Sequence, residues 1–281
     1  MLSYRHAFHA GNHADVLKHL ILVQLIHYLK QKDKPFWVID THAGAGIYAL
    51  ESVHARKLNE CETGIGRLWS RADLPDSLAQ YADLVRQANP DGKLRVYPGS
   101  PWLALHAMRD QDRLRLFELH SSDMRLLQEN FREAGRRVTI EASDGFAGLK
   151  ALLPPPPRRA LILTDPSYEI REDYQQVLHA LRDNLPRFAT GIYALWYPRL
   201  ARMESKQLPE KLKRLAGKNW LHVALTVRTP ATDGVGMHGS GMFIVNPPWT
   251  LHAMLKETMP YLVNTLGQDE GAGFILEQKT D

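Results

Sequence analysis

The tetrapeptide Asp-Pro-Ser-Tyr at Asp165–Tyr168 combines residue types that could hold a flat, amine-bearing group. The carboxylate of Asp165 can accept hydrogen bonds from an amine, and Pro166 fixes one backbone dihedral of the turn. Tyr168 offers an aromatic face against which a planar ring could stack. The apolar run 159–164 precedes the tetrapeptide, which therefore falls where a buried strand would end. Because Asp-Pro is a common turn dipeptide, an ordinary turn is the alternative interpretation of this motif by itself.

Three earlier strand ends also carry residues suited to ligand binding. The first apolar run is followed by Gly44 and Gly46, where the backbone can turn tightly and come close to a ligand. Glu118 ends the second predicted strand, where an acidic residue can bind ribose hydroxyls. After the third strand, Asp144 could accept from an adenine amine, and Gly145 carries no side chain that would block the ring. Open parallel sheets bind ligands at the carboxyl ends of their strands, so the four positions together are more specific than any one.

The elements that would position these residues alternate along the chain. Apolar runs predict strands at residues 35–40, 113–119, 137–141, 160–164, 190–197, 221–227 and 242–245. Helical periodicity predicts helices at residues 14–32, 122–134, 147–153, 172–185 and 209–215. This alternation favours an α/β fold with a mostly parallel, doubly wound sheet that has helices on both faces. The polar, glycine-bearing loop 229–241 joins the last two strands and predicts that they pair antiparallel.

Residues 51–95 are predicted to form an insertion in this fold. Glu118 lies 72 positions after Gly46 (118 − 46), whereas about 20 residues usually separate the glycine turn from the acidic residue. Apolar residues recur at near-helical spacing within the insertion, which predicts a small helical subdomain. It would serve either as a substrate-binding accessory or as solvated helix–loop packing. We therefore expect a main domain of residues 1–50 and 96–281, with an N-terminal helical extension, and an inserted subdomain of residues 51–95.

The composition is typical of a packed globular protein. Hydrophobic residues make up 44% of the chain and charged residues 23%, which argues against disorder. The single cysteine, Cys61, excludes an intramolecular disulfide and a cysteine-rich zinc site, and it is typical of a reducing compartment. The apolar stretch 20–29 is too short to span a bilayer, and no signal peptide is recognisable, so we expect a cytoplasmic protein with no membrane partner. The net charge of +4 allows a nucleic-acid partner without requiring one.

The amino-terminal segment 4–19 concentrates polar side chains before the first predicted strand. Three of its histidines, His6, His9 and His13, could be considered metal ligands. The chain offers neither partner cysteines nor a glutamate-assisted histidine pair on a helix, which are the usual supports of such a site. We therefore expect no metal and assign these histidines to exposed or hydrogen-bonded positions.

Several motifs in the chain resemble those of known methyltransferases. The tetrapeptide 165–168 resembles the Asp/Asn/Ser-Pro-Pro-Tyr/Phe signature of amino-group methyltransferases that use S-adenosylmethionine, with Ser167 in place of the second proline. Together with segment 4–19, the turn 41–46 and Phe117-Glu118, it resembles the bacterial large-subunit ribosomal RNA adenine-N6 methyltransferase J family. This resemblance runs essentially end to end. It implies a class I S-adenosylmethionine-dependent methyltransferase fold, Rossmann-like, with a doubly wound seven-stranded sheet and a small helical insertion.

The resemblance also implies roles for individual residues. Asp165 would be the catalytic acceptor, Tyr4 would engage the RNA, and Tyr168 would stack on the substrate base. Six residues would contact the S-adenosyl-L-methionine cofactor: His19, His42, Ser100, Glu118, Asp144 and Gly145. The partner would be 23S ribosomal RNA, methylated at N6 of one adenine while the RNA is protein-free or immature. The enzyme would need no metal, and we expect it to be a monomer.

The chemistry of these residues suits direct, in-line transfer of a methyl group to adenine N6. The amine is a poor nucleophile because its lone pair is delocalised into the ring. Hydrogen bonds to Asp165 and to a backbone carbonyl would favour a pyramidal nitrogen, and positioning would supply much of the rate acceleration. Asp165 could accept the proton once attack makes the amine strongly acidic. The adenine must be single-stranded or flipped out of a helix to reach such a site.

Three other functions are compatible with parts of the sequence. A DNA adenine-N6 methyltransferase would share the chemistry, but only the insertion is available as a target-recognition region. A glutamine-N5 protein methyltransferase usually has Asn at the position of Asp165. A catalytically silent RNA-binding scaffold would bind the cofactor without transferring a methyl group, and the presence of Asp165 and Glu118 argues against it.

Overall fold

A single mixed sheet forms the centre of the molecule. The computed structural model describes residues 6–51, 59–232, 234 and 236–280. Eight strands form the sheet in the order β10-β8-β9-β7-β6-β1-β4-β5. The strands span β1 Trp37–Asp40, β4 Arg113–Phe117, β5 Val138–Glu141, β6 Ala160–Thr164, β7 Ile192–Arg199, β8 Trp220–Thr226, β9 Gly239–Val245 and β10 Gly273–Lys279.

The direction of the strands identifies the fold. Strands β5, β4, β1, β6 and β7 are parallel to one another, whereas β9 lies antiparallel between β7 and β8. One reversed strand inserted beside the edge of a doubly wound sheet is the arrangement of the class I S-adenosylmethionine-dependent methyltransferases. The predicted α/β class and the predicted antiparallel pairing of the last two strands are therefore confirmed.

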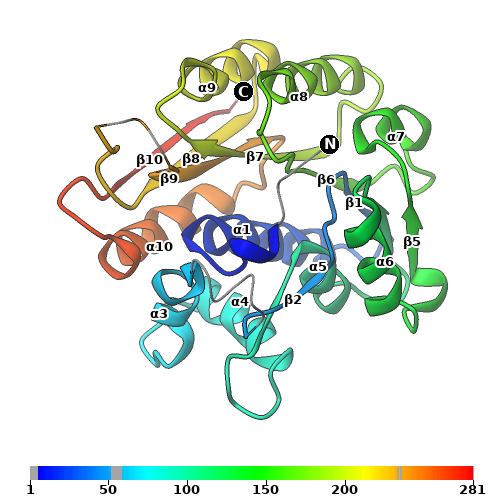
Figure 1. Ribbon diagram of the computed structural model, residues 1–281. Coiled ribbons are helices and arrows are strands. Elements are labelled where there is room, and N and C mark those ends of the chain that lie inside the picture. Colours follow the sequence, from blue (N-terminus) through cyan, green and yellow to red (C-terminus); the bar gives the residue numbers. More distant parts are fainter. Residues whose placement is uncertain (1–5, 52–58, 233, 235, 281) are drawn as a thin grey trace.

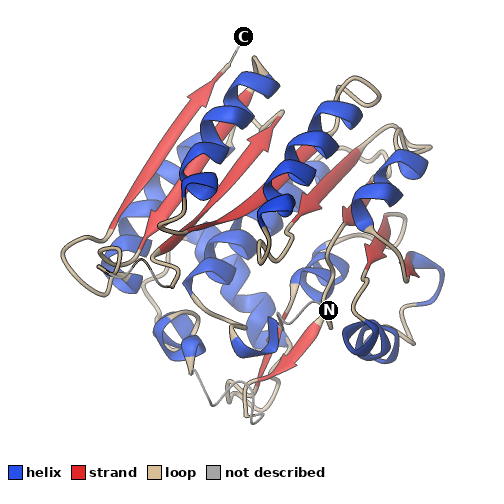
Figure 2. Ribbon diagram, turned by 45° about the horizontal axis from the view of Figure 1, so that its top comes forward, coloured by secondary structure: helices blue, strands red, loops and turns tan. Residues whose placement is uncertain are grey.

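Helices cover both faces of this sheet. Figure 1 shows α7, α8 and α9 on one side and α1, α5 and α10 on the other, and Figure 2 shows the strands as one twisted layer between them. The helices span α1 His13–Lys30, α5 Ser100–Ala107, α6 Ser121–Asn130, α7 Gly145–Leu152, α8 Arg171–Asn184, α9 Met203–Ala216 and α10 Leu251–Leu266. Short 3₁₀ helices lie at His6–Phe8, Glu60–Thr63 and Gly135–Arg137.

The sheet contains one strand more than the seven expected. Strand β10 pairs antiparallel with β8 at the edge of the sheet, and most of its side chains are exposed. Its apolar run is only three residues long, 274–276, shorter than most of the runs by which the other strands could be recognised. A separate two-stranded ribbon of β2, Ile47–Ala49, and β3, Val96–Pro98, was not predicted either.

Helix α1 lies within the molecule rather than on its surface. It is in contact with β9 and also with α4, α5 and α10, so nearly all of its side chains are buried. The sequence predicted one broad buried face, and the structure extends that burial almost around the helix. Four charged or polar side chains of α1, those of His13, Asp15, Lys18 and His19, are buried with it. Such burial requires partners for them.

The described part of the predicted insertion is helical. It contains α3, Gly66–Trp69, and α4, Asp76–Gln87. Figure 1 shows both beyond α1 and α10, and buried hydrogen bonds join them to the rest of the molecule, including Ser77 Oγ to Thr258 Oγ1 at 2.9 Å. The boundaries of a separate subdomain at 51–95 stay a prediction. Throughout the described ranges, no helix is long and apolar enough to cross a membrane.

The register of the strands aligns the predicted site residues. Asp40 is paired with Leu116 on one side and with Leu163 on the other. Glu118 and Asp165 each lie two residues beyond those partners, so both follow the sheet at the same edge. This alignment places their side chains around one cavity.

Candidate active site

A cavity of ≈740 Å³ opens at the carboxyl ends of the parallel strands. This volume is typical of small-molecule and cofactor sites, which measure about 300–1,000 Å³. The cavity brings together seven residues that the sequence predicted: His19, His42, Ser100, Glu118, Asp144, Gly145 and Asp165. Tyr4 lies outside the described residues. Tyr168 is described but does not line the cavity.

Glu118 joins the end of β4 to the glycine turn after β1. Its Oε2 accepts a hydrogen bond from the Gly44 N–H at 2.7 Å, and its Oε1 accepts one from the His120 N–H at 2.7 Å. Gly44 has a φ of +59°, a conformation that glycine adopts without strain. Burial raises the pKa of Glu118, and the two backbone donors oppose that shift. The carboxylate therefore has a structural role beside any ligand contact.

The Asp144–Gly145 pair begins helix α7 at the end of β5. Asp144 caps the helix by accepting a hydrogen bond from the Phe146 N–H at 2.9 Å. A Cβ atom on Gly145 would lie 2.1 Å from the carbonyl oxygen of Thr41, closer than any real contact. Glycine is thus required here because α7 packs directly against the backbone that follows β1. The sequence analysis gave another reason for glycine at this position, namely that a side chain would block the adenine ring.

The carboxylate of Asp40 accepts hydrogen bonds from the turn that follows β1 and from the start of α5. Its Oδ2 accepts the Ser100 hydroxyl at 2.6 Å, and its Oδ1 accepts the His42 N–H at 3.1 Å. Burial raises the pKa of Asp40 to about 6, against the effect of these two donors. The ring of His42 lies edge-on to Phe146 at 5.0 Å between centroids, and burial lowers its pKa to about 4. His42 is therefore neutral at neutral pH.

His19 reaches the cavity from α1. Its Nδ1 is 2.7 Å from the Tyr97 hydroxyl, which in turn is 2.8 Å from the Tyr81 hydroxyl. Its Nε2 is buried and has no hydrogen-bond partner within the described chain. Burial lowers the pKa of His19 well below the ordinary value. A neutral imidazole with one unsatisfied nitrogen is suited to a hydrogen bond with a bound ligand.

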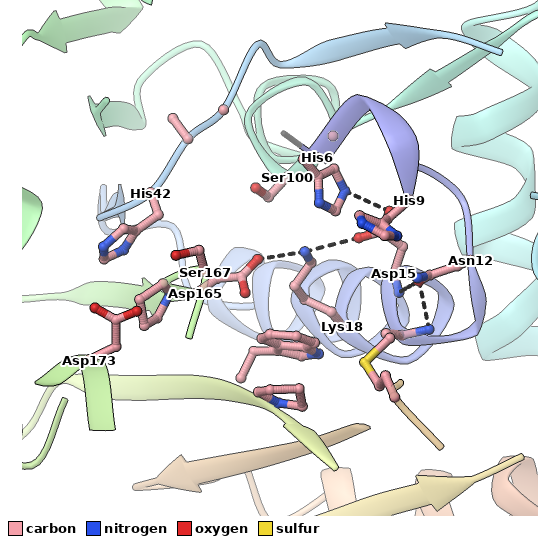
Figure 3. A pocket seen from close by; sticks show the side chains of 18 of the residues that line it. His6, His9, Asn12, Asp15, Lys18, His42, Ser100, Asp165, Ser167 and Asp173 are labelled. Atoms are coloured by element: carbon pink, nitrogen blue, oxygen red, sulfur yellow. Dashed lines mark hydrogen bonds and ion pairs between the residues drawn. The ribbon is translucent and has the colours of Figure 1, made fainter. Parts of the chain in front are cut away.

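Asp165 is held by a lysine that the sequence analysis did not select. The Lys18 ammonium lies 2.5 Å from Asp165 Oδ2 and 2.9 Å from Asp15 Oδ1 (Figure 3). Burial by itself would lower the pKa of Lys18, but the two carboxylates raise it above its ordinary value. Asp15 also accepts hydrogen bonds from the Gly11 N–H at 2.9 Å and from His6 Nε2 at 2.8 Å. Burial would raise the pKa of Asp15, and the contacts with His6 and with the Lys18 ammonium lower it well below the usual range.

A sequence signal for this cluster existed. Asp15 and Lys18 lie three positions apart inside a helix whose other residues are mostly apolar. Residues at this spacing face one another on a helix. Two opposite charges on a face expected to be buried therefore indicate a buried ion pair.

The placement of Tyr168 corrects its predicted role. Its side chain is 2% exposed, and its hydroxyl donates to the carbonyl oxygen of Trp196 at 2.6 Å. Its φ of +53° accompanies this inward direction. The ring packs in the core, so the structure does not offer it to a substrate. Trp196 lines the cavity instead, with its ring centroid 5.6 Å from Lys18 Nζ.

Two of the three predicted histidines of the amino-terminal segment, His6 and His9, have separate partners. The third, His13, differs from the expectation, because it is buried and its Nδ1 has no hydrogen-bond partner in the described chain. His6 bonds to Asp15, whereas His9 Nδ1 lies 3.0 Å from Glu60 Oε1. Within the portion of the chain that the structure describes, no group of three or more His, Cys, Asp or Glu side chains is arranged to hold a metal ion.

Comparisons with known proteins give one consistent result. A family model described as "Ribosomal RNA large subunit methyltransferase D, RlmJ" matches residues 33–276. The chain is 47% identical over 274 residues to ribosomal RNA large subunit methyltransferase J of Haemophilus influenzae, with 97% of this chain and 96% of that protein covered. It is 48% identical over 266 residues to the protein of the same name from Escherichia coli strain K12, with 95% and 94% covered.

A solved structure extends the similarity to three dimensions. The crystal structure of a Legionella pneumophila protein superposes with a TM-score of 0.89 at 35% sequence identity. The superposition covers 96% of this chain and 98% of that one. The two chains therefore share one fold over nearly their whole length.

Proposed function

The chain belongs to the RlmJ family of ribosomal RNA large subunit methyltransferases, and we propose that it methylates N6 of one adenine in 23S ribosomal RNA. The observation that carries the proposal is the position of Asp165. Its carboxylate lines the same strand-end cavity as Glu118 and Asp144, next to the wall formed by Trp196. A donor bound near Glu118 and an amine bound at Asp165 would thus share one enclosed space.

The residues at the Glu118 end fit S-adenosylmethionine. Each oxygen of the Glu118 carboxylate accepts one backbone N–H and keeps acceptor capacity for a ribose hydroxyl. Asp144 would accept the adenine amine beside the start of α7, where Gly145 lies. His19 lines the cavity and its Nε2 has no hydrogen-bond partner in the described chain, so we assign Nε2 to a bond with the methionine portion. We propose that His42 and Ser100 also act on the methionine portion. The ring of His42 would contact it directly, whereas Ser100 would act through its hydrogen bond to Asp40.

Once bound, S-adenosylmethionine supplies an electrophilic methyl group on a sulfonium centre. The protein's part is to place an adenine amine in line with it, which removes an entropic barrier. Lys18 bonds to one oxygen of Asp165 and orients the carboxylate. The other oxygen, Oδ1, can then accept an N–H of the amine and later take the proton that the methylated nitrogen releases. We propose that Trp196 and Pro198 form the wall beside the target ring, the role that the sequence had given to Tyr168.

The substrate form follows from the depth of this site. Asp165 has only 14% of its side chain exposed, so an adenine within a stacked helix cannot reach it. We therefore propose that the target lies in a single-stranded or extrudable position of protein-free or immature RNA. We expect the reaction to occur in the cytoplasm, where bacterial ribosomal RNA is made.

The proposal is tested by supplying tritiated S-adenosylmethionine with total RNA from cells that lack the enzyme. Nucleoside analysis of the labelled RNA should give N6-methyladenosine in the large-subunit fraction. Label that appears only in DNA offered in parallel would favour a DNA adenine methyltransferase. Cofactor binding without label in any polymer would favour a catalytically silent scaffold.

A further inference from the structure

The cavity continues beyond Asp165, away from the residues assigned to the cofactor. This outer chamber is lined by His13, Leu200, Arg228, Met237 and Gln268. These residues come from the start of α1, the segments that follow β7 and β8, the segment before β9, and the segment after α10. A base with its amine at Asp165 has the cofactor on one side of it. Its sugar and phosphates must therefore leave through the other side.

Arg228 brings a positive charge to the outer chamber. It is half-buried, and one guanidinium nitrogen donates to the Met237 carbonyl oxygen at 3.2 Å. Over the described ranges it forms no ion pair. The charge of Arg228 contributes to lowering the pKa of Asp269. The Asp269 carboxylate, however, already accepts hydrogen bonds from the backbone N–H groups of Thr229 and Gly271. Withdrawing a cation from water without a counter-charge is costly, so the position favours an anion.

Two further cations, Arg199 and Lys206, act on the same side chain, His238, as Arg228 does, although neither lines the cavity. Arg199 ends β7 and donates to the Thr226 hydroxyl at 2.7 Å, and Lys206 is exposed on the first turn of α9. Neither has a carboxylate partner among the residues that the structure describes. Besides burial, Arg199, Arg228 and Lys206 all lower the pKa of His238, so the three charges converge near that side chain. Arg109, by contrast, is paired with Asp112 at 3.0 Å in another part of the fold.

His13 provides a second, independent sign of a ligand. Its side chain lines the chamber and is 6% exposed, yet its Nδ1 has no hydrogen-bond partner in the described chain. Glu60, one of the charges that acts on His13, is already bonded to His9 and Asn12. A buried polar atom without a partner is uncommon in folded proteins. A hydroxyl or phosphate oxygen in the chamber would satisfy it.

We propose that the outer chamber binds the sugar-phosphate backbone beside the flipped adenosine, with Arg228 on a phosphate and His13 on the same nucleotide unit. The proposal rests on the proposed function, because it takes RNA as the substrate. A guanidinium forms paired hydrogen bonds with phosphate oxygens. Backbone contacts of this kind set affinity and register without reading sequence.

Arg228→Gln is the sharpest test, because glutamine can still donate to the Met237 carbonyl oxygen but carries no charge. Methylation rates of a ribosomal RNA fragment, measured against RNA concentration, should show KM raised about tenfold with kcat within about twofold. The slope of log KM against log salt should become shallower by about one unit, the signature of one lost phosphate contact. Cofactor affinity, measured by calorimetry, should be unchanged.

Two control variants complete the test. Arg228→Lys, which keeps the charge, should keep most of the salt dependence. Arg214→Ala removes an exposed charge near the end of α9, outside the cavity lining, and should behave as wild type. Wild-type KM and salt slope in Arg228→Gln, with the wild-type protein active on RNA, would overturn the inference and leave the proposed function intact. So would a loss confined to kcat or to cofactor binding. A wild-type protein that labels no RNA would instead refute the proposed function.

Discussion

Glu118 combines a structural role with its proposed contact to the cofactor. Because its two oxygens hold the N–H groups of Gly44 and His120, replacement affects the glycine turn as well as the ribose hydroxyls. A hydrogen bond to a charged group contributes about 1.5–3 kcal/mol. Glu118→Gln, which keeps one oxygen, should therefore weaken S-adenosylmethionine binding about ten- to hundredfold, and Glu118→Ala should weaken it further. If calorimetric titration finds wild-type affinity in a folded Glu118→Ala protein, the proposed contact between Glu118 and the cofactor is refuted.

Asp40 gives the site a specific dependence on pH. Its pKa rises from 3.8 to about 6 on folding, so between these values the folded protein holds a proton that the unfolded chain releases. The contribution of Asp40 to stability therefore falls as pH rises through this window. Asp40→Asn does not titrate and can still accept the His42 N–H. The free energy of unfolding of Asp40→Asn, relative to that of the wild type, should therefore increase by about 2 kcal/mol between pH 4 and pH 7. Urea unfolding at both pH values checks this, and a constant difference would contradict it.

At the scale of residues, the sequence predicted where the site residues lie in the fold better than it predicted which side chains they contact. The residues that end parallel strands, such as Glu118 and Asp165, were found because a strand end is visible as the end of an apolar run. The spacing of Asp15 and Lys18 indicates a buried ion pair, but the contact of Lys18 with Asp165, 147 residues away, leaves no local pattern in the sequence. Tyr168 was assigned to the wrong side of its loop. The direction of its side chain depends on a positive φ and a bond to Trp196 that the sequence does not reveal.

At the scale of elements, the site depends on the close approach of α7 to the end of β1. A methyl group on Gly145 would displace the Thr41 backbone, which belongs to the turn that carries His42. Gly145→Ala should therefore cost about 1–3 kcal/mol of stability and weaken cofactor binding at the same time. Gly273→Ala is the matched control, since nothing lies within 4 Å of its added atom. Denaturant unfolding and calorimetry of both variants provide the measurement, and equal stability of the two would contradict this packing argument.

Elements could be predicted where their periodicity was strong and buried. The parallel strands β1, β4, β6 and β7 and helix α1 were found in this way, and β5 was found although none of its residues is fully buried. Strand β10 was missed because its apolar run is only three residues long, 274–276, and polar residues make up the rest of the strand's C-terminal half. Helices α5 and α10 were not predicted from the sequence. Alternation of strands and helices was enough to fix the fold class, since few arrangements satisfy it.

At the scale of the whole molecule, the target nucleotide must be extruded to reach the cavity and the cations near its outer chamber. Ribosomal proteins and folded RNA would restrict this extrusion in a mature subunit. Protein-free ribosomal RNA, or a fragment that retains the target, should therefore be methylated faster than assembled large subunits at equal RNA concentration. Initial rates with both substrates provide the comparison. Equal or faster turnover on mature subunits would contradict the expected order.

The central claim is that Asp165 binds and deprotonates the adenine amine within the cofactor cavity. The most direct test is single-turnover methyl transfer to ribosomal RNA by folded, cofactor-saturated Asp165→Ala protein. Cofactor affinity should stay within a few-fold of wild type, because Glu118 and Asp144 are unchanged, while the transfer rate should fall about a thousandfold. Asp165→Asn, which keeps a hydrogen-bond acceptor, should retain activity only if positioning outweighs proton transfer. A near-wild-type transfer rate in Asp165→Ala would contradict the account.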